Sequence, residues 1–327
     1  MTHFVRGHHG LFVPTYRDII TPEVALGFSG HIHVELIDAK THRVKRQWHF
    51  RNLITNGGLN GMNNTAVTAT STILAKYCGV GTGSTAPANT DTTLVAEIAG
   101  RVQYVASPGP ITSYVAGSPD YHKVVADYLF TEAQANGNLT EIGFFSASSA
   151  GTMFSRQLFK DDLGTPTTVV KTSSDQLKVT YEIRLYPPAA STLYSAQDIS
   201  GTSVDVTLTP MGVGTSSWNV VFGSSMSTIH STNVYCRNGT LPSRTSTIVP
   251  GAISGGTPGT VSTAAYVTDN FYLDRTHVYD TTNGTGTITC VAANTSPTFA
   301  VGFSPGLAKD NTKRFTLNTR ISWGRHA

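Results

Sequence analysis

Apolar and polar residues alternate along several short stretches of this chain, the pattern of β-strands with one buried and one solvent-facing side. The cleanest run covers residues 177–185, where five apolar residues alternate with Lys, Thr, Glu and Arg, and a second covers residues 315–323. Other strands are expected over residues 31–37, 44–50, 121–130, 139–145, 152–159, 204–208, 218–222, 266–278 and 287–291. The pattern predicts an all-β protein.

Turn residues organise these strands and leave room for one or two short helices. Asn136-Gly137 and Ala150-Gly151 separate three of the strands, which predicts a β-meander. One short helix is expected around Leu59. Another is expected after Asp91 as its N-cap, with Leu94, Val95 and Ile98 as its buried side.

Pro187-Pro188 ends the 177–185 strand and is the expected domain boundary. We therefore expect two β-sandwich-like domains, over residues 28–187 and 188–327. Residues 1–27 contain scattered Gly and Pro without a period, which predicts an extended N-terminal arm. The two long alternating runs each follow a lysine-bearing turn, so the two domains are candidates for an internal repeat.

Composition narrows the class of protein. Charged residues make up 13% of the 327 residues, well below the usual quarter, which suits a subunit whose surface is covered by neighbours. Three distant cysteines, Cys78, Cys236 and Cys290, form no paired framework, so we expect reduced thiols. No apolar run approaches the ~20 residues of a membrane helix, and the first residues lack a signal peptide's apolar core.

The glycine-rich stretch from Gly79 to Arg101 follows an apolar run and loosely fits a dinucleotide-binding fingerprint. That fingerprint requires a helix to begin at the glycines, whereas here Pro87 and a polar run follow. No Gly-Lys-Ser/Thr follows either, so the stretch is not a P-loop. We expect no nucleotide and no other cofactor.

The same stretch resembles a string found in structural proteins of tailed-bacteriophage virions, especially tail and tail-fibre proteins. The resembling residues are Gly79 to Arg101, then Leu139-Thr-Glu-Ile-Gly-Phe-Phe145, Gly151-Thr-Met-Phe-Ser-Arg156, and the alternating strand after Lys171. The resemblance covers residues 28–187, and residues 188–327 carry none. It implies a non-enzymatic tail component, such as a fibre, sheath, collar or baseplate-associated subunit, made in the host bacterial cytoplasm and located in the virion.

Such a subunit acts through assembly with copies of itself, with a trimer or higher ring as the first expectation, and with other tail proteins. Within the expected arm, apolar side chains that have no obvious core to enter are the predicted contacts. These are Phe4, Leu11, Phe12 and Tyr16.

Residues 1–51 hold seven of the eleven histidines and a net charge of +3. His31 and His33 share one face of a strand, and a trimer could gather six imidazoles around its axis. No carboxylate or cysteine completes a site within one chain, so no metal is expected and this pair is a weak candidate.

Basic residues interleaved with aromatic ones over residues 43–51 raise the question of nucleic-acid binding. The basic members are Arg43, Lys45, Arg46 and Arg51, and Trp48 and Phe50 lie between them. Because the whole chain is only slightly basic, the solvated face of a hairpin is the favoured interpretation, and nucleic acid is not an expected partner.

No G-x-S-x-G or His-Glu-x-x-His motif is present, and we expect no enzyme. The sparse acids Glu132, Glu141, Asp161 and Asp162 are interpreted as turn or solvated-face residues, which leaves a depolymerase as a minor possibility.

The sequence is compatible with two further roles in a virion. One is a receptor-binding module for host surface glycan, with aromatic residues of the second domain as its platform. These are Tyr266, Phe271, Tyr272 and Tyr279. The second role is that of a capsid decoration protein.

Overall fold

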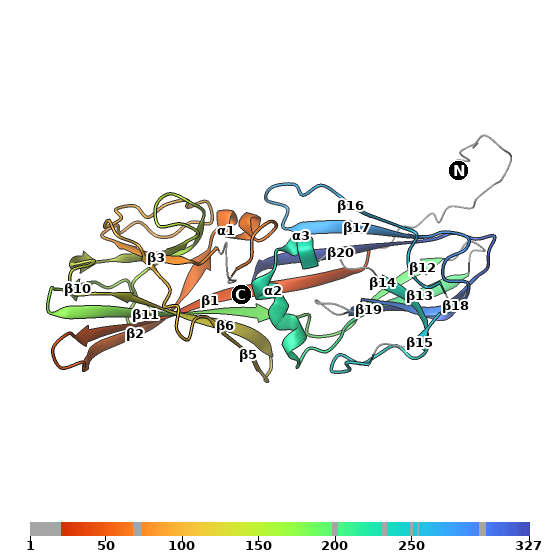
Figure 1. The fold of residues 1–327 in the computed structure, drawn as a ribbon, viewed down its shortest axis with the longest axis horizontal. Helices are drawn as coiled ribbons and strands as arrows, with labels where there is room; N and C mark the ends of the chain where they lie inside the picture. The colour runs from red at the N-terminus through yellow and green to blue at the C-terminus, as the bar shows by residue number, and fades with distance from the viewer. Residues whose placement is uncertain are drawn as a thin grey trace.

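The computed structural model describes residues 21–67, 74–197, 202–229, 234–248, 251–253, 255–293 and 299–327. It shows an elongated molecule in which two β-rich units lie along the long axis (Figure 1). The first unit contains strands β1 to β11, and the second contains β12 to β20. The expected all-β fold is confirmed, and the helices of the described residues are short.

The first unit is a two-layer sandwich. Its elements are β1 (Glu23–Asp38), β2 (Val44–Ile54), α1 (Asn56–Gly61), β3 (Tyr77–Gly81), β4 (Val102–Gln103), β5 (Ile111–Val115), β6 (Tyr121–Phe130), β7 (Gly137–Leu139), β8 (Glu141–Phe145), β9 (Met153–Leu158), β10 (Val169–Lys171) and β11 (Asp175–Tyr186). One layer runs β5-β6-β11-β1-β2, and the other runs β2-β9-β8-β3-β4. The stacked rings of Phe144 and Tyr181, 3.8 Å apart, join the two layers.

The second unit is built in the same way. Its elements are β12 (Thr192–Gln197), β13 (Ser203–Pro210), η1 (Ser216–Asn219), α2 (Val220–Gly223), α3 (Met226–Ile229), β14 (Val234–Asn238), β15 (Gly251–Ala252), β16 (Thr260–Thr263), β17 (Tyr272–Tyr279), β18 (Gly286–Ala293), β19 (Phe299–Lys309) and β20 (Phe315–Arg325). One layer runs β16-β17-β20, and the other runs β12-β13-β19-β18-β14-β15.

Strand order is repeated between the units. The path β4-β3-β8-β9-β2 of the first unit matches β15-β14-β18-β19-β13 of the second, and β5-β6-β11 matches β16-β17-β20. The matching strands also follow one another in the same order along the chain. This shared topology supports the expectation of an internal repeat, for which the sequence offered only the two lysine-bearing turns.

Strand β1 connects the two units. Residues 27–38 pair antiparallel with β11, whereas residues 23–28 pair parallel with β20. In Figure 1, β1 accordingly extends along the long axis from the first unit into the second. The expected arm over residues 1–27 is therefore wrong for residues 23–27, which lie in this strand. Its remainder up to residue 20, including Phe4, Leu11, Phe12 and Tyr16, lies outside the described residues.

The long alternating runs behave as predicted. Leu177, Val179, Tyr181, Ile183 and Leu185 are all buried, as are the apolar residues of β20. Their charged neighbours on β11 face outward and make ion pairs across the sheet surface. Alternation identified these strands correctly because each has one face on the core and one in solvent.

Two expected elements are wrong, and the strand expected over residues 266–278 begins only at Tyr272 as β17. No helix follows Asp91, because the backbone N–H of Ile98 and the carbonyl of Ala96 bond to residues 80 and 82, in and next to β3. Residues 218–222 form helical turns where we expected a strand. The buried residues there are Trp218, Val221 and Phe222, whose i, i+3, i+4 spacing is helical.

Candidate functional site

The glycine-rich stretch of the first unit surrounds a carboxylate of the protein itself. The Glu141 side chain, at the start of β8, is fully buried. It accepts hydrogen bonds from the backbone N–H groups of Gly83 (3.1 Å), Val95 (3.0 Å) and Ala96 (2.7 Å). The Arg156 guanidinium on β9, also buried, contacts the same carboxylate at 2.8–3.0 Å. The loop therefore cradles an anion, as a nucleotide-binding loop does, but this anion belongs to the fold.

This close approach explains two glycines of the motif. A Cβ atom added at Gly83 would lie 2.4 Å from a carboxylate oxygen of Glu141. One added at Gly81 would lie 2.5 Å from the carbonyl oxygen of Ala96. Both distances are far below a van der Waals contact, so any side chain at either position would displace the loop from the carboxylate.

Further residues of the glycine-rich stretch make polar contacts around this pair. Arg156 also pairs with Asp91 (2.7 Å) and donates to the carbonyl oxygen of Thr85 (2.8 Å). Arg101 pairs with Glu97, four residues before it, at 2.5 Å. We call Asp91, Glu141 and Arg156 the motif lock, because their polar atoms join β8, β9 and the loop.

The interpretation of Glu141 as a turn or solvated-face acid is therefore wrong. Its neighbours in sequence are the apolar residues of Leu139 to Phe145, which form β7 and β8. A lone carboxylate inside such an apolar run, together with Arg156 in the paired strand, was the signal that could have identified it. Burial of a charge without a partner is too costly to occur there.

A second polar cluster lies on the outer face of the same unit, over β1, β2 and β11. Their register places Arg51 and Glu182 on either side of His31, and His49 and Thr180 on either side of His33. These side chains, with Arg184, line an open hollow of about 510 Å³. We call this site the histidine hollow.

Ion pairs leave the histidine hollow with excess positive charge. The Glu182 carboxylate is shared by Lys123 (2.8 Å) and Arg184 (2.6 Å). Arg51 donates to the carbonyl oxygen of His326 (3.0 Å), and no carboxylate of the described residues lies within ion-pair distance of it. Among the residues that line the hollow, Arg51 and Arg184 are the two cations and Glu182 is the one carboxylate.

The imidazoles of the histidine hollow respond to this charge. Burial, with Arg184 and Arg51, lowers the pKa of His31 to about 4, and the opposing effect of Glu182 is smaller. His31 Nε2 lies 3.1 Å from the Ser29 hydroxyl. The His33 ring stacks on that of His49 at 4.0 Å, and burial followed by His49 lowers the pKa of His33.

His31 and His33 thus lie on one face of a strand, as predicted. Within the described ranges, no group of three or more His, Cys, Asp or Glu side chains is placed to hold a metal ion. The basic residues of β2 do not act together either. Lys45 pairs with Asp175 at 2.6 Å, and Arg46 lies over the Trp48 ring.

Of the aromatic residues expected as a glycan platform in the second unit, Tyr279 is in the core. Tyr279 is fully buried against Phe315, and its hydroxyl donates to the backbone carbonyl of Val234. Tyr266 stacks on Trp323, whereas Tyr272 lies beneath Arg320. Tyr279 is therefore no part of an exposed platform, whereas Tyr266, Phe271 and Tyr272 are half-buried.

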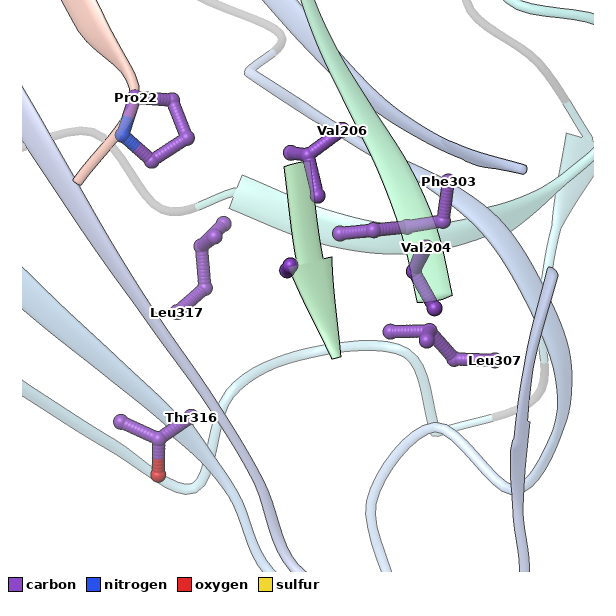
Figure 2. Close-up of a pocket in the computed structure, with 8 residues that line it drawn as sticks. Pro22, Val204, Val206, Phe303, Leu307, Thr316 and Leu317 are labelled. Carbon is purple, nitrogen blue, oxygen red and sulfur yellow. The ribbon is translucent and has the colours of Figure 1, made fainter. Parts of the chain in front are cut away.

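A small apolar cavity of about 50 Å³ lies between the layers of the second unit. Figure 2 shows Pro22 and Leu317 on one side and Val206, Phe303 and Leu307 on the other. It contains almost no polar groups, so it is a gap in the core and offers no chemistry for a ligand.

Within the described part of the chain, no helix is long and apolar enough to cross a membrane. The chain matches no protein-family model, no curated protein and no solved structure. Its function is therefore inferred from its own residues.

Proposed function

We propose that this chain is a non-enzymatic structural subunit of a bacteriophage virion, most simply a tail component that acts through assembly. The observation that carries the proposal is the motif lock. The polar groups of the residues that resemble tail proteins bind one another. Glu141 accepts hydrogen bonds from three backbone N–H groups and from Arg156, and Arg156 also pairs with Asp91. A motif used in this way maintains a shape, which is what an assembly subunit requires.

Two further features agree with this role. The chain repeats one sandwich topology along an elongated body, so it can present several faces to neighbours. Its charged fraction of 13% is low, and low charge is typical of surfaces that become covered in an assembly. The partners proposed are copies of this chain and other tail proteins.

The first experiment measures the mass of the purified chain by light scattering, with and without residues 1–20. We expect a symmetric oligomer, with a trimer as the first expectation, and its loss on truncation, because the apolar side chains of Phe4, Leu11 and Phe12 are then removed. A truncated chain that keeps the full oligomer would remove these residues from the proposed contacts.

Location in the particle is tested separately, by gold-labelled antibody on purified virions under the electron microscope. Label on the tail supports the proposal. Label distributed over the capsid would show a decoration protein instead, and virions without the chain would overturn the virion role.

A further inference from the structure

The histidine hollow has the size of a small-molecule site. Its volume of about 510 Å³ lies within the ~300–1,000 Å³ range of ligand pockets. It is lined from three neighbouring strands, so its shape depends on the sheet and not on a loop. Sites on rigid strands hold their geometry without a cost of ordering.

The charges of the hollow select an anion. Arg51 and Arg184 line it from the two strands that flank β1: Arg51 on β2 pairs with His31, and Arg184 on β11 pairs with Ser29. The one carboxylate, Glu182, already has Lys123 and Arg184 as partners. A bound oxyanion would offset the surplus and accept charge-assisted hydrogen bonds, and guanidinium groups are well suited to carboxylates.

The remaining space requires that the anion belong to a larger polar molecule. The hollow is much larger than one carboxylate, and it is also lined by His33 and His49, whose rings stack on each other. The Thr180 hydroxyl already donates to Asp127 (2.6 Å), so it can still accept a hydrogen bond. Imidazole nitrogens and a hydroxyl beside the two arginines suit a ligand that carries several hydroxyls as well as the anion.

We propose that the histidine hollow binds an acidic sugar, with its carboxylate at Arg51 and Arg184 and its hydroxyls toward His33, His49 and Thr180. The inference stands independently of the virion role, because binding is a property of the purified chain. It places the sugar on the first unit, away from the aromatic residues that the sequence suggested.

The experiment titrates the full-length chain with glucuronate, with glucose as the neutral counterpart and with inorganic phosphate, using isothermal calorimetry. We expect saturable binding of glucuronate, at least tenfold weaker binding of phosphate, and none of glucose. Absence of saturable glucuronate binding would overturn the site. Phosphate that binds as tightly as glucuronate would show recognition of the anion alone and overturn the sugar assignment.

Variants assign the interaction to the hollow. Arg51→Gln and Arg184→Gln should each weaken glucuronate binding about tenfold or more, since each removes a charged donor. Arg43→Gln removes the same charge at the other end of the hairpin and should leave affinity unchanged. Equal losses in all three variants would show long-range charge attraction and overturn the site.

A readout on the unmodified protein covers the case of a variant that fails to fold. The ring-proton NMR signals of His31 and His33 should shift on glucuronate addition and not on glucose addition. The groups facing His31 are His33, Arg51, Glu182 and Arg184. Because the bound carboxylate adds negative charge, it should raise the pKa of His31 from about 4, and affinity should rise as the pH falls from 7 to 5. An unshifted His31 signal would place the ligand elsewhere.

Discussion

The two units have the same strand order but stabilise the equivalent region by different chemistry. In the first unit, the pair β8–β9 and its adjoining loop are joined by the buried charges of Glu141 and Arg156. In the second, the matching pair β18–β19 has Lys309 as its one charged residue and is packed by Ile288, Val291 and Val301. Strand pairing therefore determines the topology, and the matching strand pair can be stabilised either by apolar packing or by a buried pair of charges.

This difference also agrees with where the glycine-rich motif ends. The glycines of the motif serve a carboxylate, and the second unit has no carboxylate on β18 or β19 for a loop to surround. A sandwich of the same topology can thus exist without the motif, which is consistent with the absence of the resemblance beyond residue 187.

The largest expected effect is in the motif lock. Glu141→Gln should lower the free energy of unfolding by about 3–5 kcal/mol, because Arg156 would keep a buried charge without its main partner. Hydrogen-exchange mass spectrometry should show the loss of protection in β3, β8 and β9, and not in β18 or β19. Asp162→Asn, at an exposed carboxylate of the loop before β10, is the matched control. Similar loss of protection in both units would show that they unfold as one.

The next effect tests the repeat through two matched lysines. Lys171 Nζ donates to the Thr131 carbonyl (2.8 Å) beyond β6, and Lys309 Nζ donates to the Asp280 carbonyl (2.6 Å) beyond β17. Lys→Met at either position should cost about 1–3 kcal/mol, because a buried lysine no longer donates to the carbonyl. Urea unfolding measures both variants. If the variant at one position leaves the free energy of unfolding unchanged, the two lysines are not equivalent.

A smaller effect concerns the junction between the units, where Arg244 contacts both carboxylate oxygens of Asp120 at 2.7 Å. Asp120→Asn should cost about 1–2 kcal/mol at pH 7, since the pair is partly exposed. Burial alone would raise the pKa of Asp120, but hydrogen bonds from Arg244 and Tyr114 bring it below 3.8.

The pH dependence of this junction follows from the depressed pKa. The contribution of Asp120 is complete above the unfolded value of 3.8 and is lost as the pH falls through the lower folded value. Urea unfolding of the unmodified chain and of Asp120→Asn should therefore show a smaller difference in the free energy of unfolding at pH 3 than at pH 7. A difference that stays constant would mean that the carboxylate charge contributes nothing.

The smallest effect fills the apolar cavity of the second unit. Ala196→Val should raise stability by less than about 1 kcal/mol, because the added methyl groups enter a space of about 50 Å³. Ala126→Val, at a buried alanine of β6, should instead destabilise the first unit through overpacking. Thermal melting compares the two variants. A destabilising Ala196→Val would show that the cavity cannot adapt to the larger side chain.

Periodicity predicted most of the strands, and its errors have identifiable causes. The strand expected over residues 218–222 assumed a period of two, whereas Trp218, Val221 and Phe222 are the buried set. The helix expected after Asp91 assumed that the segment would satisfy its own N–H groups. The Val95 and Ala96 N–H groups instead bond to Glu141, which lies 45–46 residues away in sequence. Local patterns cannot indicate such a distant acceptor.

By itself, the sequence determined the β-rich class, the positions of β6, β11 and β20, and the shared outward face of His31 and His33, because these depend on local alternation. Only the tertiary structure decided that β1 serves both units, that Glu141 is the anion of the glycine loop, and that Arg51 and Arg184 line one hollow from β2 and β11. These features arise from pairing between strands far apart in the chain, which no local period records.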